Sequence, residues 1–237
     1  GTGKTTLADW AAWHLSQHYK DAAFGFDPKP LKFSTKTTSQ ARDLFYTYDA
    51  LSHFQAANLR AGEVTDISKY LELQALGEAI ARSNPSPELA AKVGTVLPKK
   101  PQGGVVLIDE VDKAPRDFPN DLLAELEKPP FKFNIKELTG FEITQNTEKP
   151  VFIIITSNNE KGLPDAFLRR CVFHHINFPE PEILLDIVKT KLNSENPLFA
   201  DAINMFLEFR NKKNINKPPA TSELIDWISC LDENKLL

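Results

Sequence analysis

The sequence predicts an α/β fold in which a parallel sheet lies between layers of helices, followed by a smaller helical subdomain. Val105–Ile108 and Val151–Ile155 are short, continuously apolar and rich in β-branched residues, which is typical of strands buried on both faces. Between these runs lies a segment whose apolar residues have helical spacing. Parallel strands need a crossover connection of this kind. After Pro179 the hydrophobic spacing becomes helical throughout.

The first elements are expected to alternate between helix and strand. A helix is expected from Lys4 to about His18, and Leu31–Ser34 is a weaker strand candidate. Residues 40–57 carry apolar side chains at helical spacing behind Ser39, a suitable N-cap, so they predict a second helix. A further helix is expected over Leu71–Ala81.

The middle of the chain mixes loop, helix and strand signals. Ser83–Gly104 contains four prolines, so we expect a mobile loop there. A helix is expected over Asn120–Glu127. Apolar residues alternate with polar ones over residues 131–135 and again at 141–143, which predicts a half-exposed hairpin. Besides the three sheet strands named above and this hairpin, a further strand is expected over Val172–Ile176.

The tail predicts three amphipathic helices, marked by apolar residues within 183–188, 203–207 and 224–231. Three short helices would form a small, lid-like subdomain. The expected domains are therefore residues 1–179 for the α/β part and residues 180–237 for the helical lid.

Composition excludes several classes of protein. With 41% hydrophobic and 25% charged residues, the chain is of ordinary globular type. Its 28 basic and 32 acidic residues give a formal charge of -4, which disfavours a general nucleic-acid binder. No apolar run of about 18 residues and no secretion signal occur, so a cytoplasmic location is expected. Cys171 and Cys230 lie far apart without other ligands nearby, and we interpret them as reduced, packed thiols.

A candidate phosphate-binding loop opens the sequence. Gly1-Thr2-Gly3-Lys4-Thr5-Thr6 matches the end of the pattern GxxxxGK followed by Ser or Thr, without its first glycine. In such loops, backbone N–H groups and a helix N-terminus bind phosphate oxygens. Lys4 would reach the β- and γ-phosphates, and Thr5 would bind Mg²⁺. Taken alone, the match fits a surface turn about as well.

A second motif favours the phosphate-binding interpretation. The apolar run at Val105 ends abruptly in Asp109 and Glu110. The carboxyl ends of parallel strands are where open α/β sheets bind ligands, so Asp109 can hold Mg²⁺ and Glu110 can deprotonate an attacking water. Asn158, which follows the Val151 strand, can position the same water, although an Asn in this place is most often a turn former.

Two adjacent arginines form the last candidate. Arg169 and Arg170 lie just before Cys171. Such pairs are usually solvated surface residues. The functional interpretation is a guanidinium that enters the nucleotide site of a neighbouring subunit and stabilises phosphate charge.

Together these motifs resemble the AAA+ ATPases, and within them the MoxR-type branch, over nearly the whole chain. The most specific stretches are residues 105–114, 156–158 and 163–170. The resemblance implies a P-loop NTPase core, with three layers around a parallel sheet, and a small C-terminal helical lid. It also implies that the strand feeding the phosphate loop would precede Gly1. We therefore expect a core that lacks its first, central strand and a chain that is a fragment and folds poorly alone.

The resemblance assigns roles to residues. It implies Mg²⁺ ligation by Thr5 and Asp109. The sequence departs from the family at sensor 2, where an arginine is usual, because the nearest matching position here is Ser222. Lys217 could substitute there, without the fork geometry of arginine. The implied catalytic residues are Glu110, Asn158 as sensor 1, and Arg170 as arginine finger, with Arg169 as the less favoured finger. The implied ATP-binding residues are Gly1, Thr2, Gly3, Lys4, Thr5, Thr6 and Asp109.

The implied function is that of an ATP- and Mg²⁺-dependent motor or chaperone that remodels a protein client. It would work in a ring of identical subunits, usually a hexamer, and partners of such proteins often carry a von Willebrand A domain. Two alternatives stay open. One is a nucleotide-dependent assembly switch with negligible turnover, and the other is an AAA+ component of a nucleic-acid-associated restriction or defence complex that could use GTP.

Overall fold

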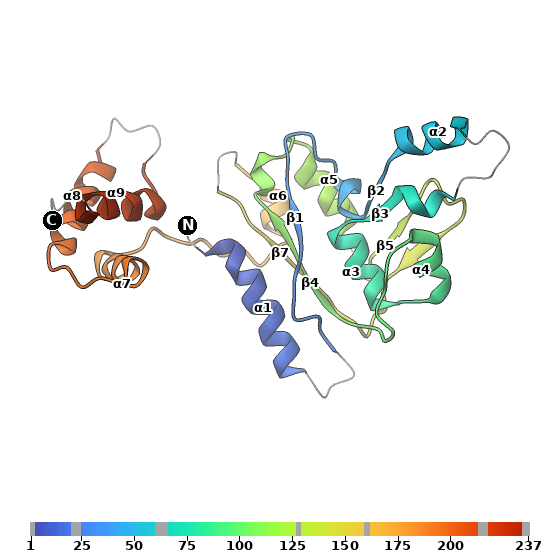
Figure 1. The fold of residues 1–237 in the computed structure, drawn as a ribbon, viewed down its shortest axis with the longest axis horizontal. Helices are drawn as coiled ribbons and strands as arrows, with labels where there is room; N and C mark the ends of the chain where they lie inside the picture. Colours follow the sequence, from blue (N-terminus) through green and yellow to red (C-terminus); the bar gives the residue numbers. More distant parts are fainter. Residues whose placement is uncertain are drawn as a thin grey trace. The chain divides into compact units, whose positions relative to one another are not determined.

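A computed structural model of the chain describes residues 3–19, 25–59, 66–126, 129–158, 162–212 and 218–233. The chain forms two compact units, one of them Lys4–Phe173 and the other containing the chain from His174 onward (Figure 1). The first unit contains helices and strands, and the described residues of the second contain helices only. Along the described residues, no helix combines the length and apolar character needed to cross a membrane.

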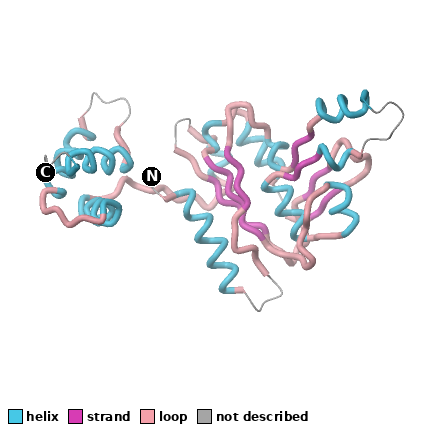
Figure 2. The backbone as a smooth tube through the Cα atoms, in the orientation of Figure 1, coloured by secondary structure: helices cyan, strands magenta, loops and turns pink. Residues whose placement is uncertain are grey.

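Three parallel strands form the central sheet of the first unit, in the order β1-β4-β7 (Figure 2). They are β1 (Leu31–Ser34), β4 (Gly104–Asp109) and β7 (Val151–Ile155), all expected from the sequence. In their register Ser34 lies opposite Asp109, and Ile108 lies opposite Ile155. The residues that follow β4 and β7 therefore emerge side by side at the same edge of the sheet.

Strand β4 is buried on both faces, as its continuously apolar sequence predicts. Val105 and Leu107 pack with Ala8 and Ala12 of helix α1 (Lys4–His18). The alternate residues of β4 belong to the main core on the other face, where helix α3 (Ala75–Ser83) packs. Full burial of each such side chain contributes about 1.5–3 kcal/mol. The prediction of a parallel sheet covered by helices is confirmed.

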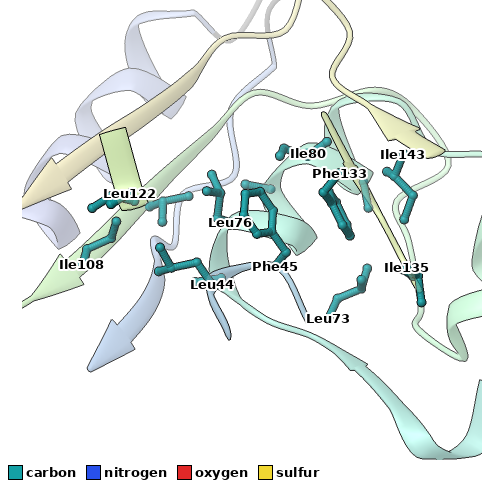
Figure 3. Close-up of a cluster of buried hydrophobic side chains, with 14 of the residues drawn as sticks. Leu44, Phe45, Leu73, Leu76, Ile80, Ile108, Leu122, Phe133, Ile135 and Ile143 are labelled. Carbon is teal, nitrogen blue, oxygen red and sulfur yellow. The ribbon is translucent and has the colours of Figure 1, made fainter. Parts of the chain in front are cut away.

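The hairpin expected after residue 130 is also present. Strands β5 (Lys132–Asn134) and β6 (Glu142–Thr144) pair antiparallel. Figure 3 shows Phe133 and Ile143 beside Ile80, in one apolar cluster that continues to Ile108 at the sheet. The hairpin is thus fixed to the core by alternate apolar side chains.

The prediction of one helix over residues 40–57 is wrong. The segment forms a short 3-10 helix η1 (Ala41–Leu44), strand β2 (Tyr46–Tyr48) and helix α2 (Ala50–Leu59). Strand β2 pairs antiparallel with β3 (Leu71–Leu73), and this pairing satisfies backbone groups that a helix would bond internally. Tertiary pairing of aromatic residues with high β propensity overrides the helical spacing.

The start of η1 also differs from the expectation that Ser39 is an N-cap. The backbone N–H of Gln40 donates to the Asp43 carboxylate at 2.8 Å. The Ser39 hydroxyl instead accepts from the backbone N–H of Lys36 at 2.9 Å. Ser39 therefore closes the turn before the helix.

The next two elements begin and end differently from the prediction. The expected helix over Leu71–Ala81 begins later, because its first residues form β3 after the 3-10 helix η2 (Ile67–Tyr70). The expected loop over Ser83–Gly104 contains helix α4 (Pro87–Val93). The Ser86 hydroxyl caps this helix by accepting from the Leu89 N–H at 3.0 Å. A proline in the first turn of a helix removes no internal hydrogen bond, so Pro87 is compatible with this helix, while the other three prolines lie outside it.

The rest of the first unit contains the 3-10 helix η3 (Val111–Lys113), helix α5 (Phe118–Glu125) and helix α6 (Asp165–Leu168). Helix α5 thus begins before the expected Asn120. The strand expected over Val172–Ile176 is wrong, since these residues form no strand and Val172 and Phe173 are exposed. A strand needs a hydrogen-bonding neighbour, and among the described residues no segment pairs with this one.

The second unit contains the three expected helices, α7 (Pro181–Leu192), α8 (Phe199–Arg210) and α9 (Thr221–Glu233). Each helix contributes one buried stripe to a shared apolar core. That core comprises Leu184, Val188, Phe199, Ala202, Ile203, Phe206, Leu224 and Ile228.

Candidate functional site

Five of the predicted site residues lie together at the carboxyl edge of the sheet. Lys4 and Thr5 begin α1, Asp109 ends β4 and Glu110 follows it, and Asn158 follows β7. Direct hydrogen bonds connect Thr5 to Asp109, Lys4 to Asn158, and Asn158 to Glu110. Segments more than a hundred residues apart in sequence, as Lys4 and Asn158 are, are thus joined at one place.

The pair Thr5 and Asp109 is an oxygen-rich site. The Thr5 Oγ1 lies 3.2 Å from Asp109 Oδ2 and 3.4 Å from Oδ1. Packing of α1 against β4 brings the first turn of the helix over the end of the strand. A hydroxyl and a carboxylate are ligands that suit Mg²⁺, with the remaining positions filled by water or phosphate oxygens. The donor set therefore fits this cation.

Lys4 lies in the first turn of α1, beside Asn158. Its ammonium donates to the Ser157 carbonyl oxygen at 2.7 Å and to the Asn158 Oδ1. A helix N-terminus presents free N–H groups and the positive end of the helix dipole, both of which favour an anion. Gly3, directly before Lys4, has a φ of 74°, which favours glycine.

The predicted phosphate loop includes three further residues. Gly1 and Thr2 lie outside the described residues, and Thr6 is exposed in the first turn of α1. Their predicted contacts with phosphate stay predictions.

Glu110 occupies an unusual backbone conformation. Its φ and ψ are 56° and 51°, a left-handed region that costs a residue with a side chain about 1–2 kcal/mol. Its Oε1 accepts from Asn158 Nδ2 at 3.0 Å, and its Oε2 pairs with Lys113 Nζ at 2.5 Å. Asn158 therefore bridges Lys4 and Glu110, with one amide atom on each.

Three residues that the sequence analysis did not single out complete the network. Both carboxylate oxygens of buried Asp112 accept from the Asn158 N–H at 3.2 Å. The buried Thr156 hydroxyl contacts both Asp109 and Glu110. Lys113 pairs with Glu110 from three residues further along. Two signals in the sequence could have found them, since each of these residues follows β4 or β7 within a few positions and lies in a stretch that carries the family resemblance.

Neither a protein-family model nor a curated protein matches this sequence. The functional argument therefore depends on the contacts described above.

The two candidate arginines lie apart from this network. Arg169 and Arg170 follow α6 and are exposed. The Arg170 guanidinium donates to the Ala166 carbonyl oxygen at 3.0 Å, and within the described part of the chain neither arginine hydrogen-bonds to the five-residue network. Their role in a neighbouring subunit stays a prediction. Of the sensor 2 candidates, Ser222 is exposed on α9 and Lys217 lies outside the described residues.

Cys171 follows this pair directly. Burial raises the pKa of its thiol above the ordinary value, which keeps the sulfur protonated and poorly nucleophilic at neutral pH. Cys171 is half-buried against the main core, so its interpretation as a packed thiol is confirmed, whereas Cys230 is exposed and the same interpretation is wrong there.

Proposed function

We propose that the protein binds and hydrolyses ATP as a motor or chaperone of the AAA+ type, similar to the MoxR branch. The observation that carries this proposal is the contact of the Thr5 hydroxyl with the Asp109 carboxylate. It joins a loop of the phosphate-binding pattern to a carboxylate at the end of a buried parallel strand, where open α/β sheets bind their ligands. The adjoining Lys4–Asn158–Glu110 contacts support the same reading.

In this proposal each residue has a separate task. The Lys4 ammonium and the N–H groups of the first turn of α1 hold the phosphates. Thr5 and Asp109 hold Mg²⁺, which neutralises phosphate charge when bound. Glu110 accepts a proton from the water that attacks the γ-phosphorus, while the bond from that phosphorus to the β-phosphate oxygen breaks. Asn158 orients Glu110 through its amide hydrogen bond.

Subunits act in pairs in this proposal. Arg170, or less favourably Arg169, would stabilise transferring charge in the site of a neighbouring subunit of a ring, which is hexameric in the proposal. Hydrolysis would change the angle between the α/β core and the helical lid and so remodel a bound protein client. A partner with a von Willebrand A domain would fit the same branch of the family.

Phosphate release from Mg²⁺-ATP by the full chain tests the proposal. Glu110→Gln and Arg170→Ala should each lower the rate on the order of a hundredfold or more. Two controls make the same chemical changes away from the site, at exposed side chains: Glu142→Gln on the hairpin and Arg42→Ala. Both controls should leave the rate of phosphate release unchanged. Rates in the first pair equal to those of the controls would reject the assignment.

A second candidate function is a nucleotide-dependent assembly switch with negligible turnover. One observation favours it: both oxygens of Glu110 are engaged, by Asn158 and by Lys113, as in a base held away from its water. The lack of an arginine at the Ser222 position is consistent with slow turnover. The two candidates differ in steady-state phosphate release, which the switch would show only at background level.

A further inference from the structure

The turn that carries Asp109 and Glu110 is closed by one residue of the neighbouring strand exit. The Thr156 N–H donates to the Ile108 carbonyl at 3.0 Å, and the Thr156 carbonyl accepts from the Val111 N–H at 2.9 Å. Between these two backbone bonds the Thr156 hydroxyl makes two more. It accepts from the Glu110 N–H at 2.9 Å and donates to Asp109 Oδ1 at 2.5 Å.

The direction of these two bonds is fixed by chemistry. A backbone N–H can only donate, so the Thr156 oxygen is the acceptor of the Glu110 bond. The hydroxyl has a single proton, and that proton is then directed to Asp109. The Thr156 bond thereby orients Asp109 so that Oδ2, the oxygen nearer to Thr5, faces the place of a cation or its water shell.

The Thr156 bond also bears on the conformation of Glu110. Glu110 adopts left-handed φ and ψ, a region that side-chain-bearing residues keep only when surrounding contacts hold them there. The Thr156 hydroxyl binds the N–H of this same residue. Thr156 is itself only 6% exposed, so water competes poorly for the bond.

We propose that Thr156 is a positioning residue for the hydrolysis proposed above, on which this inference rests. One hydroxyl orients the carboxylate that holds the cation and fixes the backbone from which the general base projects. The two backbone bonds of Thr156 are available to any residue except proline in this place, and valine has the same β-branched shape. Only the hydroxyl connects Asp109 to Glu110, and removing it misplaces both groups at once.

The test compares variants of the full chain in phosphate release from Mg²⁺-ATP, with kcat and KM determined separately. Thr156→Val removes the hydroxyl and keeps the shape, and Thr156→Ser keeps the hydroxyl and removes a methyl. Thr144→Val, on the hairpin strand β6, is the matched control. Thr156→Cys, whose thiol is a weak hydrogen-bonding group, is measured alongside, so that the comparison stands if valine weakens the fold.

We expect kcat to fall on the order of a hundredfold in Thr156→Val, as misplacement of catalytic groups by about 1 Å does, with KM nearly unchanged. Thr156→Cys should fall in the same direction, and Thr156→Ser should restore most of the rate. In a Glu110→Gln background, Thr156→Val should have much less further effect, because residues that act as a unit are not additive.

Three results would overturn the inference. They are a Thr156→Val rate equal to that of Thr144→Val, equal losses in the serine and valine variants, and a full additional loss in the Glu110→Gln background. A Glu110→Gln protein that releases phosphate at the wild-type rate would instead refute the proposed function itself. The two failures are therefore distinguishable in one set of measurements.

Discussion

Replacement of Asp109 by asparagine should separate catalysis from folding. Asp109 accepts hydrogen bonds from Thr156 at 2.5 Å and from Thr5 at 3.2 Å. A hydrogen bond to a charged group contributes about 1.5–3 kcal/mol, and a neutral one about 0.5–1.5 kcal/mol. Asparagine keeps an acceptor oxygen for Thr156, and weakening each of the two bonds by about 1–1.5 kcal/mol costs about 2–3 kcal/mol in total. Since an amide is cheaper to bury than a carboxylate, we expect a net loss of about 1 kcal/mol.

The functional loss should be larger than the loss of stability. Without the charge the Thr5 and Asp109 pair is a poor Mg²⁺ site, and a hundredfold loss of turnover corresponds to about 2.7 kcal/mol. Denaturant unfolding and phosphate release at several Mg²⁺ concentrations measure the two effects, with Asp121→Asn, at an exposed position of α5, as the control. Wild-type turnover in Asp109→Asn, or a loss of stability of more than about 3 kcal/mol, would refute this reasoning.

Two further predictions concern packing and thiol chemistry. Gly77→Ala should destabilise the fold by about 1–3 kcal/mol or more in denaturant unfolding, because a Cβ at this position would lie 1.9 Å from the Phe45 carbonyl oxygen. Gly25→Ala, where no atom of the described residues lies within 4 Å of the added carbon, is its control, and equal effects would contradict the geometry. Because burial raises the pKa of Cys171, iodoacetamide at pH 8 should modify exposed Cys230 first, with Cys171 gaining reactivity at higher pH. Mass spectrometry shows the order, and faster modification of Cys171 would contradict it.

The sheet and the network of contacts were predictable because their signals are local. Lys4–His18 begins directly after a glycine and has helical composition, and β4 is continuously apolar because both of its faces are covered. Strand β7 is equally apolar in sequence but only half-buried, with Phe152 exposed. Polar residues directly after such strands must emerge at one edge if the strands are parallel. Asp109, Glu110 and Asn158 could therefore be placed together before their distances were known.

The segment between β1 and α3 could not be predicted in this way. Phe45 and Tyr48 occupy positions that fit a helical stripe, while Tyr46 and Tyr48 also fit a short strand. The choice depends on β3, a partner strand more than twenty residues away, as the register of Tyr46 with Leu73 shows. Spacing within a window contains no information about such a partner.

The supporting residues of the site were missed for a related reason. Thr156 and Asp112 act through contacts between two strand exits, and these contacts follow from the register of β4 with β7 rather than from any pattern within one segment. The left-handed conformation of Glu110 is equally invisible in the sequence, because glutamate has no preference for it.

The nucleotide that the Glu110→Gln protein holds after incubation with Mg²⁺-ATP tests the central claim most directly. If Lys4, Thr5 and Asp109 bind the nucleotide and Glu110 activates water, the variant should retain bound ATP, while the wild-type protein converts it to ADP and phosphate. Chromatography of the nucleotide released from the washed protein distinguishes the two. Bound ADP in the variant at the wild-type level, or no bound nucleotide in either protein, would contradict the account.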